Sequence, residues 1–139
     1  MIYYPKTYGT CSGANKAINL AYKIKKENKD KKIFIYKELL HNPYVIDELK
    51  QNDIFCIDNL ELLNKDDILI IRAHGETKET FEYLEKNNIE YYDATCINVK
   101  KVQNIVKEKY NENYKIIIIG KKTHPEVIAT NSYCDNTAI

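Results

Sequence analysis

The sequence predicts an α/β fold in which mainly parallel sheet modules carry flanking helices. Short apolar runs alternate along the 139 residues with charged stretches whose apolar positions recur at helical spacing. Runs such as "ILII", residues 68–71, are apolar at successive positions, a pattern typical of strands buried on both faces of a parallel sheet. Strands that alternate with helices in this way favour the α/β class.

The first half of the chain predicts three strands and two helices. The apolar start at residues 1–4, "MIYY", and the runs "KIFIY" (32–36) and "DIFCID" (53–58) are the expected strands. A helix is expected over residues 42–52, because an Asn-Pro pair opens it and suits the cap and the first helical position. The helix expected over residues 15–29 has its apolar residues at helical spacing: Ala17, Leu20, Ala21 and Ile24.

The second half repeats the alternation. Strands are expected in residues 66–75 and 89–95, with a helix over 78–88 between them. A long helix is expected from about Cys96 to Tyr110, followed by a last apolar run in "YKIIIIGKKTHPEV" (114–127). A chain of 139 residues is long enough for one compact domain, or for one domain and part of another.

The charge balance argues against one class of partner. The chain has 21 Lys and Arg against 20 Asp and Glu, a net charge of +1, and no basic run or stripe. Proteins that hold a phosphate backbone need such a stripe, so nucleic acid is not an expected partner. The amino-terminal residues lack the pattern of a signal peptide, and no apolar run approaches the roughly 18 residues of a membrane span. We therefore expect a cytoplasmic protein with no membrane partner.

The four cysteines are widely scattered, at positions 11, 56, 96 and 134. In the cytoplasm, scattered cysteines are core residues, metal ligands or reactive thiols more often than disulfide partners. Cys56, inside the apolar run "IFCI", is expected in the core. Cys11 lies in the polar, glycine-flanked stretch "YGTCSGANKA", a composition that favours close approach of the backbone to a ligand.

Cysteines and histidines that could act in binding or catalysis recur at the points where a predicted strand ends and a loop begins. The carboxyl ends of parallel strands share one edge of a sheet, so these residues are expected along one rim. The residues concerned are Cys11, His41, His74, Cys96 and His124. Cys96 is expected at the mouth of a helix, where unpaired N–H groups and the positive end of the helix dipole favour a thiolate over a thiol.

Each of these residues could have a purely structural role. As a group, they fit two kinds of ligand. Histidines and helix N-termini stabilise phosphate oxygens, which indicates an anion site. Cysteines from distant loops can hold zinc or an iron–sulfur cluster, and an iron that no cysteine binds can act as a Lewis acid. Glu126, two residues after His124, is either an acid that complements a helix dipole or a proton donor.

Five segments spread over nearly the whole chain narrow these alternatives: "YGTCSGANKAI", "ELLHNPYVIDEL", "IIRAHGE", "DATCINVKKV" and "IGKKTHPEV". In this order and at these intervals they closely resemble the 4-hydroxy-3-methylbut-2-enyl diphosphate reductase family. The resemblance implies the last step of the non-mevalonate isoprenoid pathway, which yields isopentenyl and dimethylallyl diphosphate. It also implies three α/β modules around a pocket that holds a 4Fe-4S iron–sulfur cluster.

The resemblance implies a role for single residues. The implied cluster ligands are Cys11 and Cys96, and the implied acid that delivers protons is Glu126. The implied partners are a small allylic diphosphate as substrate and a ferredoxin or flavodoxin as electron donor. The residues implied to hold the substrate diphosphate are His41, His74 and His124.

The chain departs from the family's pattern in length and at single positions. Members are typically longer, and the part beyond this chain carries the third cluster cysteine, a role that the resemblance does not give to Cys134. Ile97 stands where the family usually has a proline, a residue favoured at the first helical position. The expected division is a first module over residues 1–95 and the start of a second, truncated module over 96–139.

We therefore expect the amino-terminal part of the reductase, poorly active by itself. Two alternatives stay open. One is a non-catalytic remnant that binds diphosphate through its histidines and holds no cluster. The other is a zinc-binding domain that uses Cys11, Cys96 and a histidine.

Overall fold

The computed structural model describes residues 1–6, 9–39 and 42–139. At its centre is a four-stranded sheet in the order β2-β1-β3-β4, with every neighbouring pair parallel. The predicted α/β class with a mainly parallel sheet is confirmed. Its strands are β1 (Ile33–Tyr36), β2 (Ile54–Ile57), β3 (Ile68–Ile71) and β4 (Glu90–Asp93).

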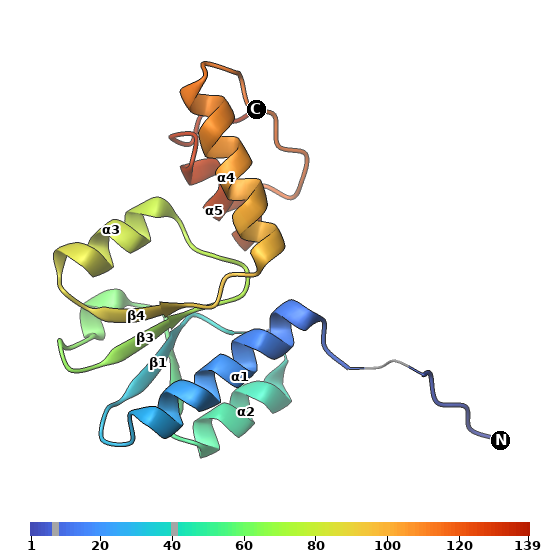
Figure 1. The fold of residues 1–139 in the computed structure, drawn as a ribbon, viewed down its shortest axis with the longest axis vertical. Helices are drawn as coiled ribbons and strands as arrows, with labels where there is room; N and C mark the ends of the chain where they lie inside the picture. Colours follow the sequence, from blue (N-terminus) through green and yellow to red (C-terminus); the bar gives the residue numbers. More distant parts are fainter. Residues whose placement is uncertain (7–8, 40–41) are drawn as a thin grey trace.

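Helices cover both faces of this sheet (Figure 1). Helices α1 (Ser12–Glu27) and α2 (Pro43–Gln51) pack on one face, where Ala17 and Ala21 meet the isoleucines of the strands. On the other face, α3 (Lys78–Lys86) buries Leu84 against β3. Because both faces are covered, every residue of β3 is buried, as the run of four apolar residues predicts.

One prediction, for a cysteine at the edge of the sheet, is wrong. Cys56 was expected in the core, but its side chain is exposed in β2. The run "IFCI" is apolar throughout, yet β2 is an edge strand, so its burial pattern leaves Phe55 and Cys56 partly uncovered. A sequence pattern of this length does not distinguish an edge strand from a central one.

Beyond the sheet, the chain forms two further helices that pack on each other. Helix α4 (Ile97–Asn111) leaves the carboxyl end of β4, and α5 (Pro125–Ser132) lies against it (Figure 1). A short 3₁₀ turn, η1 (Leu60–Leu62), precedes β3. The helices predicted near residues 15–29, 42–52 and 96–110 are therefore present with small shifts of their ends.

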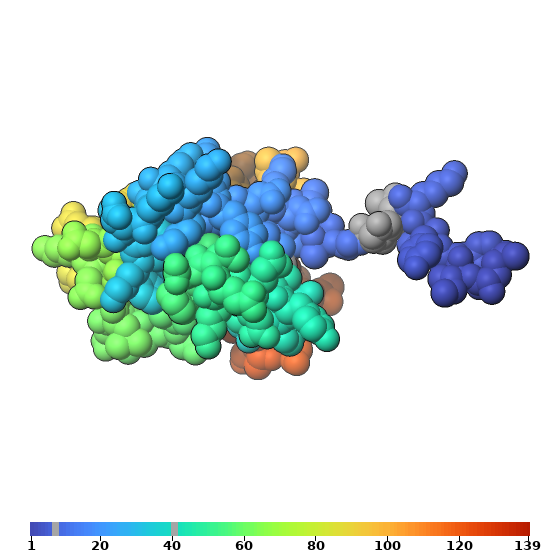
Figure 2. Space-filling view, turned by 90° about the horizontal axis from the view of Figure 1, so that it is seen from below, coloured from blue at the N-terminus to red at the C-terminus, as the bar shows by residue number. Residues whose placement is uncertain are grey.

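Two predicted strands are absent among the described residues. Residues 1–4 form no strand: Ile2, Tyr3 and Tyr4 are each more than 80% exposed, and the segment runs away from the sheet (Figures 1 and 2). The run at 116–119 is also irregular, although Ile118 N donates to Ile139 O and Ile139 N donates to Ile116 O, the pattern of a parallel pair. A strand needs a neighbouring strand, and apolar composition alone does not supply one.

Among the residues that the structure describes, no helix is long and apolar enough to cross a membrane.

Candidate functional site

Two cysteines stand at the starts of two helices and approach each other around Gly13. Cys11 is the N-cap of α1, where its Sγ accepts a hydrogen bond from Ala14 N at 3.5 Å. Cys96 is the N-cap of α4, and its backbone N donates to Ala73 O at 2.9 Å, which fixes it to the end of β3. A Cβ on Gly13 would lie 3.0 Å from the Cys96 Sγ and 3.9 Å from the Cys11 Sγ. The glycine therefore leaves space between the two sulfur atoms.

Both sulfur-bearing residues line one pocket, whose volume is about 400 Å³. Four of the predicted site residues meet there although they are far apart in the sequence: Cys11, His74, Cys96 and Glu126. The rest of the wall is mostly small or apolar, with Ala73 and Val102 among its members. Such a wall lowers the local dielectric and strengthens the interactions that the few polar groups can make.

His74 lines the pocket, and the second described histidine, His124, lies beside His74. His74 and His124 have ring centroids 6.1 Å apart and meet edge to face. His124 is the N-cap of α5, and its Nδ1 accepts a hydrogen bond from Glu126 N at 3.3 Å. This bond ties the histidine to the first turn of the helix that carries Glu126. The third predicted histidine, His41, lies outside the described residues.

Three helices begin at this site, because Cys11, Cys96 and His124 cap α1, α4 and α5. Each helix start carries unpaired N–H groups and the positive end of its dipole. A bound anion is therefore favoured at these helix starts. The sequence predicted a helix start at Cys96, and the structure adds the same arrangement at Cys11 and His124.

The turn after His74 depends on a glycine. Gly75 has a φ of +77° and donates its N–H to Arg72 O at 3.0 Å. A Cβ at this position would lie 2.9 Å from Gln103 Nε2 and 3.1 Å from Thr95 Cγ2. The turn that carries His74 therefore fits directly against α4 and against the residue before Cys96.

We expect Gly75→Ala to lower the free energy of unfolding by roughly 2–4 kcal/mol, because positive φ and overpacking both oppose it. The measurement is urea unfolding of the purified chain. Gly9→Ala is the matched control: Gly9 also has a positive φ, of +111°, but an added Cβ meets nothing within 4 Å. Equal losses in the two variants would contradict the role given to the contact with Gln103.

A buried ion pair supports the same turn and was not predicted from the sequence. Arg72 Nε lies 2.8 Å from Glu76 Oε1, and Lys37 Nζ lies 3.8 Å from Glu76 Oε2. Burial, followed by the nearby Glu76 carboxylate, raises the pKa of Tyr36. The sequence carries no local signal for this pair, because Arg72 and Glu76 are four residues apart in a turn and not in a helix.

The described part of the chain contains no group of three His, Cys, Asp or Glu residues arranged to hold a metal ion. Cys134 stands apart from the pocket lining: it is fully buried, and its Sγ donates to Asn131 O at 3.2 Å. The described residues thus bring two thiols to the pocket, Cys11 and Cys96.

The comparison with known proteins assigns the chain to a family. A family model described as LytB protein matches residues 2–139. The chain belongs to the LytB family.

Relatives in the LytB family are named 4-hydroxy-3-methylbut-2-enyl diphosphate reductase. The protein of Caldanaerobacter subterraneus subsp. tengcongensis is 44% identical over 132 residues, which cover 94% of this chain and 46% of the relative. The protein of Thermoanaerobacter sp. (strain X514) is 46% identical over 132 residues, with the same two shares. The chain therefore spans somewhat less than half the length of these relatives.

Two solved structures of this kind share the fold. The Plasmodium falciparum E-1-hydroxy-2-methyl-but-2-enyl-4-diphosphate reductase superposes with a TM-score of 0.90 at 31% identity, over 96% of this chain and 42% of that one. A second structure, described as the reductase that is the terminal enzyme of the non-mevalonate pathway, gives 0.82 at 32% identity, over 94% and 47%. The LytB fold thus includes both the sheet and the α4–α5 pair.

Proposed function

We propose that the chain supplies the amino-terminal part of a 4-hydroxy-3-methylbut-2-enyl diphosphate reductase. In the proposed reaction the C4–O bond of the allylic diphosphate breaks, two electrons and two protons enter, and water leaves. The products are isopentenyl and dimethylallyl diphosphate. The observation that carries the proposal is the pocket that joins two helix-capping cysteines, His74 and Glu126 in a chain of the LytB family.

Cys11 and Cys96 are proposed to hold a 4Fe-4S cluster. Their sulfur atoms flank the space that Gly13 leaves open, and cysteine sulfur is the usual ligand of iron–sulfur clusters. When bound, the cluster would supply electrons and a Lewis-acidic iron for the hydroxyl that leaves. The third thiolate would come from outside this chain, and a ferredoxin or flavodoxin would deliver the electrons.

His74 and His124 are proposed to bind the diphosphate, together with His41. Two imidazoles with centroids 6.1 Å apart, beside the start of α5, can donate to neighbouring phosphate oxygens. This would orient the substrate so that its hydroxyl end reaches the cysteine side of the pocket. Holding the diphosphate end of the substrate in place would keep its hydroxyl end close to the reacting groups, as catalysis by proximity requires.

Glu126 is proposed to hold the proton that the leaving hydroxyl needs. Its side chain is half-buried at the pocket wall, and its backbone N is fixed to His124 Nδ1. The same helical turn would therefore hold the diphosphate and protonate the hydroxyl.

Two wider expectations belong to this proposal. Residues 1–95 would form one module and residues 96–139 the start of a second, since the sheet ends at Asp93 and α4 packs on α5. A cluster held by thiolates suits a reducing compartment, so the chain is proposed to act in the cytoplasm.

The experiment that tests the function joins residues 1–139 to the remaining carboxyl-terminal part of the Thermoanaerobacter relative. The chimera is reconstituted anaerobically with iron and sulfide, and turnover is measured with a reduced viologen. Formation of both dehydroxylated diphosphates supports the proposal. A chimera that binds iron and substrate but forms neither product would overturn it. Stoichiometric zinc in the purified chain would favour the metal-binding alternative instead.

We expect Gly13→Ala to lower the affinity of the reconstituted chain for iron by about tenfold, because a Cβ 3.0 Å from Cys96 Sγ would displace that sulfur. The free energy of unfolding should change little, because this clash opposes the preference for alanine over glycine in a helix, which is up to about 1 kcal/mol. The amount of bound iron and the free energy of unfolding in urea are measured on the same preparations. The control is Ser12→Ala, an exposed residue of the same turn. Unchanged iron in Gly13→Ala would contradict the proposed position of the cluster.

A further inference from the structure

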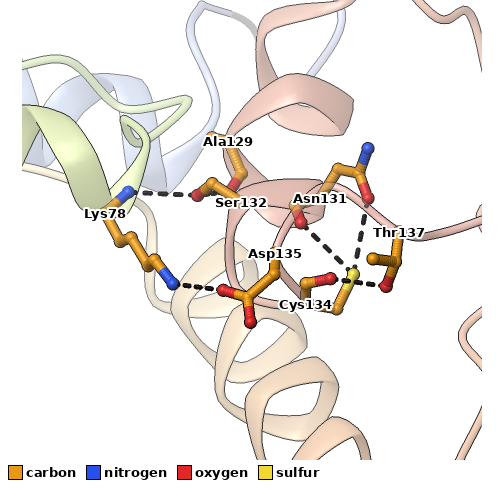
Figure 3. A network of polar contacts seen from close by, with 7 residues as sticks. All are labelled: Lys78, Ala129, Asn131, Ser132, Cys134, Asp135 and Thr137. Carbon is orange, nitrogen blue, oxygen red and sulfur yellow. Dashed lines mark hydrogen bonds and ion pairs between the residues drawn. The ribbon is translucent and has the colours of Figure 1, made fainter.

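The start of α3 is held by a side chain from the far end of α5. Lys78 N donates to Ser132 Oγ at 3.0 Å, a contact between residues 54 positions apart in the chain (Figure 3). Ser132 is fully buried, and its hydroxyl donates in turn to Ala129 O at 2.7 Å. The hydroxyl is therefore used both as acceptor and as donor.

This contact pairs a backbone N–H group at the start of α3. The first N–H groups of a helix have no partner within it. In α3, Thr77 is the N-cap and its Oγ1 accepts from Thr80 N at 3.3 Å, which does not serve the first helical residue. Ser132 supplies that acceptor from the α4–α5 side of the molecule. Without Ser132, the N–H of Lys78 would be left unpaired against α5, at a free-energy cost.

A second contact beside it is of a weaker kind. Lys78 Nζ forms an ion pair with Asp135, whose side chain is 54% exposed (Figure 3). Exposed ion pairs contribute little. The turn beyond α5 is held by its own hydrogen bonds, since Thr137 Oγ1 donates to Cys134 O at 2.6 Å. Of the two contacts of Lys78, the buried one with Ser132 is therefore the one that fixes α3 to α5.

The joined elements are those that carry the two described histidines. Lys78 follows His74 by four residues, and Ser132 closes the helix that His124 opens. We propose that Ser132 is a positioning residue, which sets the separation of His74 and His124 by capping α3 across the molecule. The inference rests on the proposed diphosphate site, because that site needs both imidazoles at one ligand.

The test is a double-mutant cycle that removes the hydrogen bond from either side. Ser132→Ala removes the acceptor. Lys78→Pro removes the donor at a first helical position where proline is favoured, and Thr77, with φ −70° and ψ 158°, has the extended backbone required before proline. Lys78→Met is the matched control, since it loses the ion pair and keeps the N–H. Inorganic pyrophosphate binding is measured by calorimetry, and the orientation of α5 relative to the sheet by residual dipolar couplings.

We expect Ser132→Ala and Lys78→Pro each to reorient α5 and to weaken pyrophosphate binding by about three- to tenfold, the range for one net hydrogen bond. The double variant should lose no more than either single variant, and Lys78→Met should match the wild type. An unchanged α5 orientation in both single variants overturns the inference, as does reorientation without loss of affinity. If the wild-type chain does not bind pyrophosphate, the proposed diphosphate site fails, while the couplings still test the contact itself.

Discussion

Glu126→Gln in the chimeric reductase is expected to lower turnover by about 10²-fold or more, with substrate affinity nearly unchanged. Glutamine keeps the size and the hydrogen-bonding reach of glutamate but has no proton to give. Glu126 lines the pocket together with the two cysteines. The hydrogen bond that its backbone N–H donates to His124 Nδ1 does not depend on the carboxyl group. The diphosphate site should therefore remain intact. Single-turnover kinetics and a substrate titration measure the two quantities separately.

The matched control for Glu126 is Glu79. Each is an acidic residue in the first turn of its helix, Glu126 in α5 and Glu79 in α3, so each complements a helix dipole. Only Glu126 is among the residues that line the pocket. Glu79→Gln should therefore leave turnover close to that of the parent. If the two variants lose turnover equally, the loss reflects the dipole and Glu126 is not the proton donor.

The parts of the fold that could be predicted from the sequence are those set by local pattern. The alternation of apolar runs and amphipathic stretches predicted β1 to β4 and their helices, and burial on both faces accounts for the continuous apolar run of β3. The two failures, at residues 1–4 and 116–119, have the same composition as true strands. A true strand has a neighbouring strand to pair with, and among the described residues these two segments have none. Pairing depends on the fold as a whole and cannot be read from the segment alone.

The site shows the same division between residue type and placement. Residue type and position at the ends of elements were enough to single out Cys11, Cys96 and Glu126, which the structure brings into one pocket. Gly13 and Ser132 could not be found in this way. A glycine matters at 13 because two sulfurs flank it, and a serine matters at 132 because it accepts the first N–H of α3. Both reasons depend on residues that are distant in the sequence.

The backbone of Cys96 is fixed at the end of β3 and at the start of α4, which makes removal of its sulfur informative. Its backbone N is bonded to Ala73 O at the end of β3, and it caps α4. A serine at this position keeps the backbone bond and is itself a favoured N-cap, so the fold should be retained. What is lost is a soft thiolate, for which a hydroxyl is a poor substitute toward iron. Stability and iron binding should therefore separate cleanly in this variant.

We accordingly expect Cys96→Ser to lower the affinity of the chain for iron by about a hundredfold or more, beyond the loss for a residue that only supports a ligand. Anaerobic reconstitution, iron quantitation and the visible spectrum measure it, and urea unfolding should match the wild type. Cys56→Ser is the control, because that thiol is exposed on the edge strand β2 and lines no part of the pocket. Full iron retention in Cys96→Ser would remove Cys96 as a ligand. An equal loss in Cys56→Ser would mean that the iron is bound without regard to the pocket.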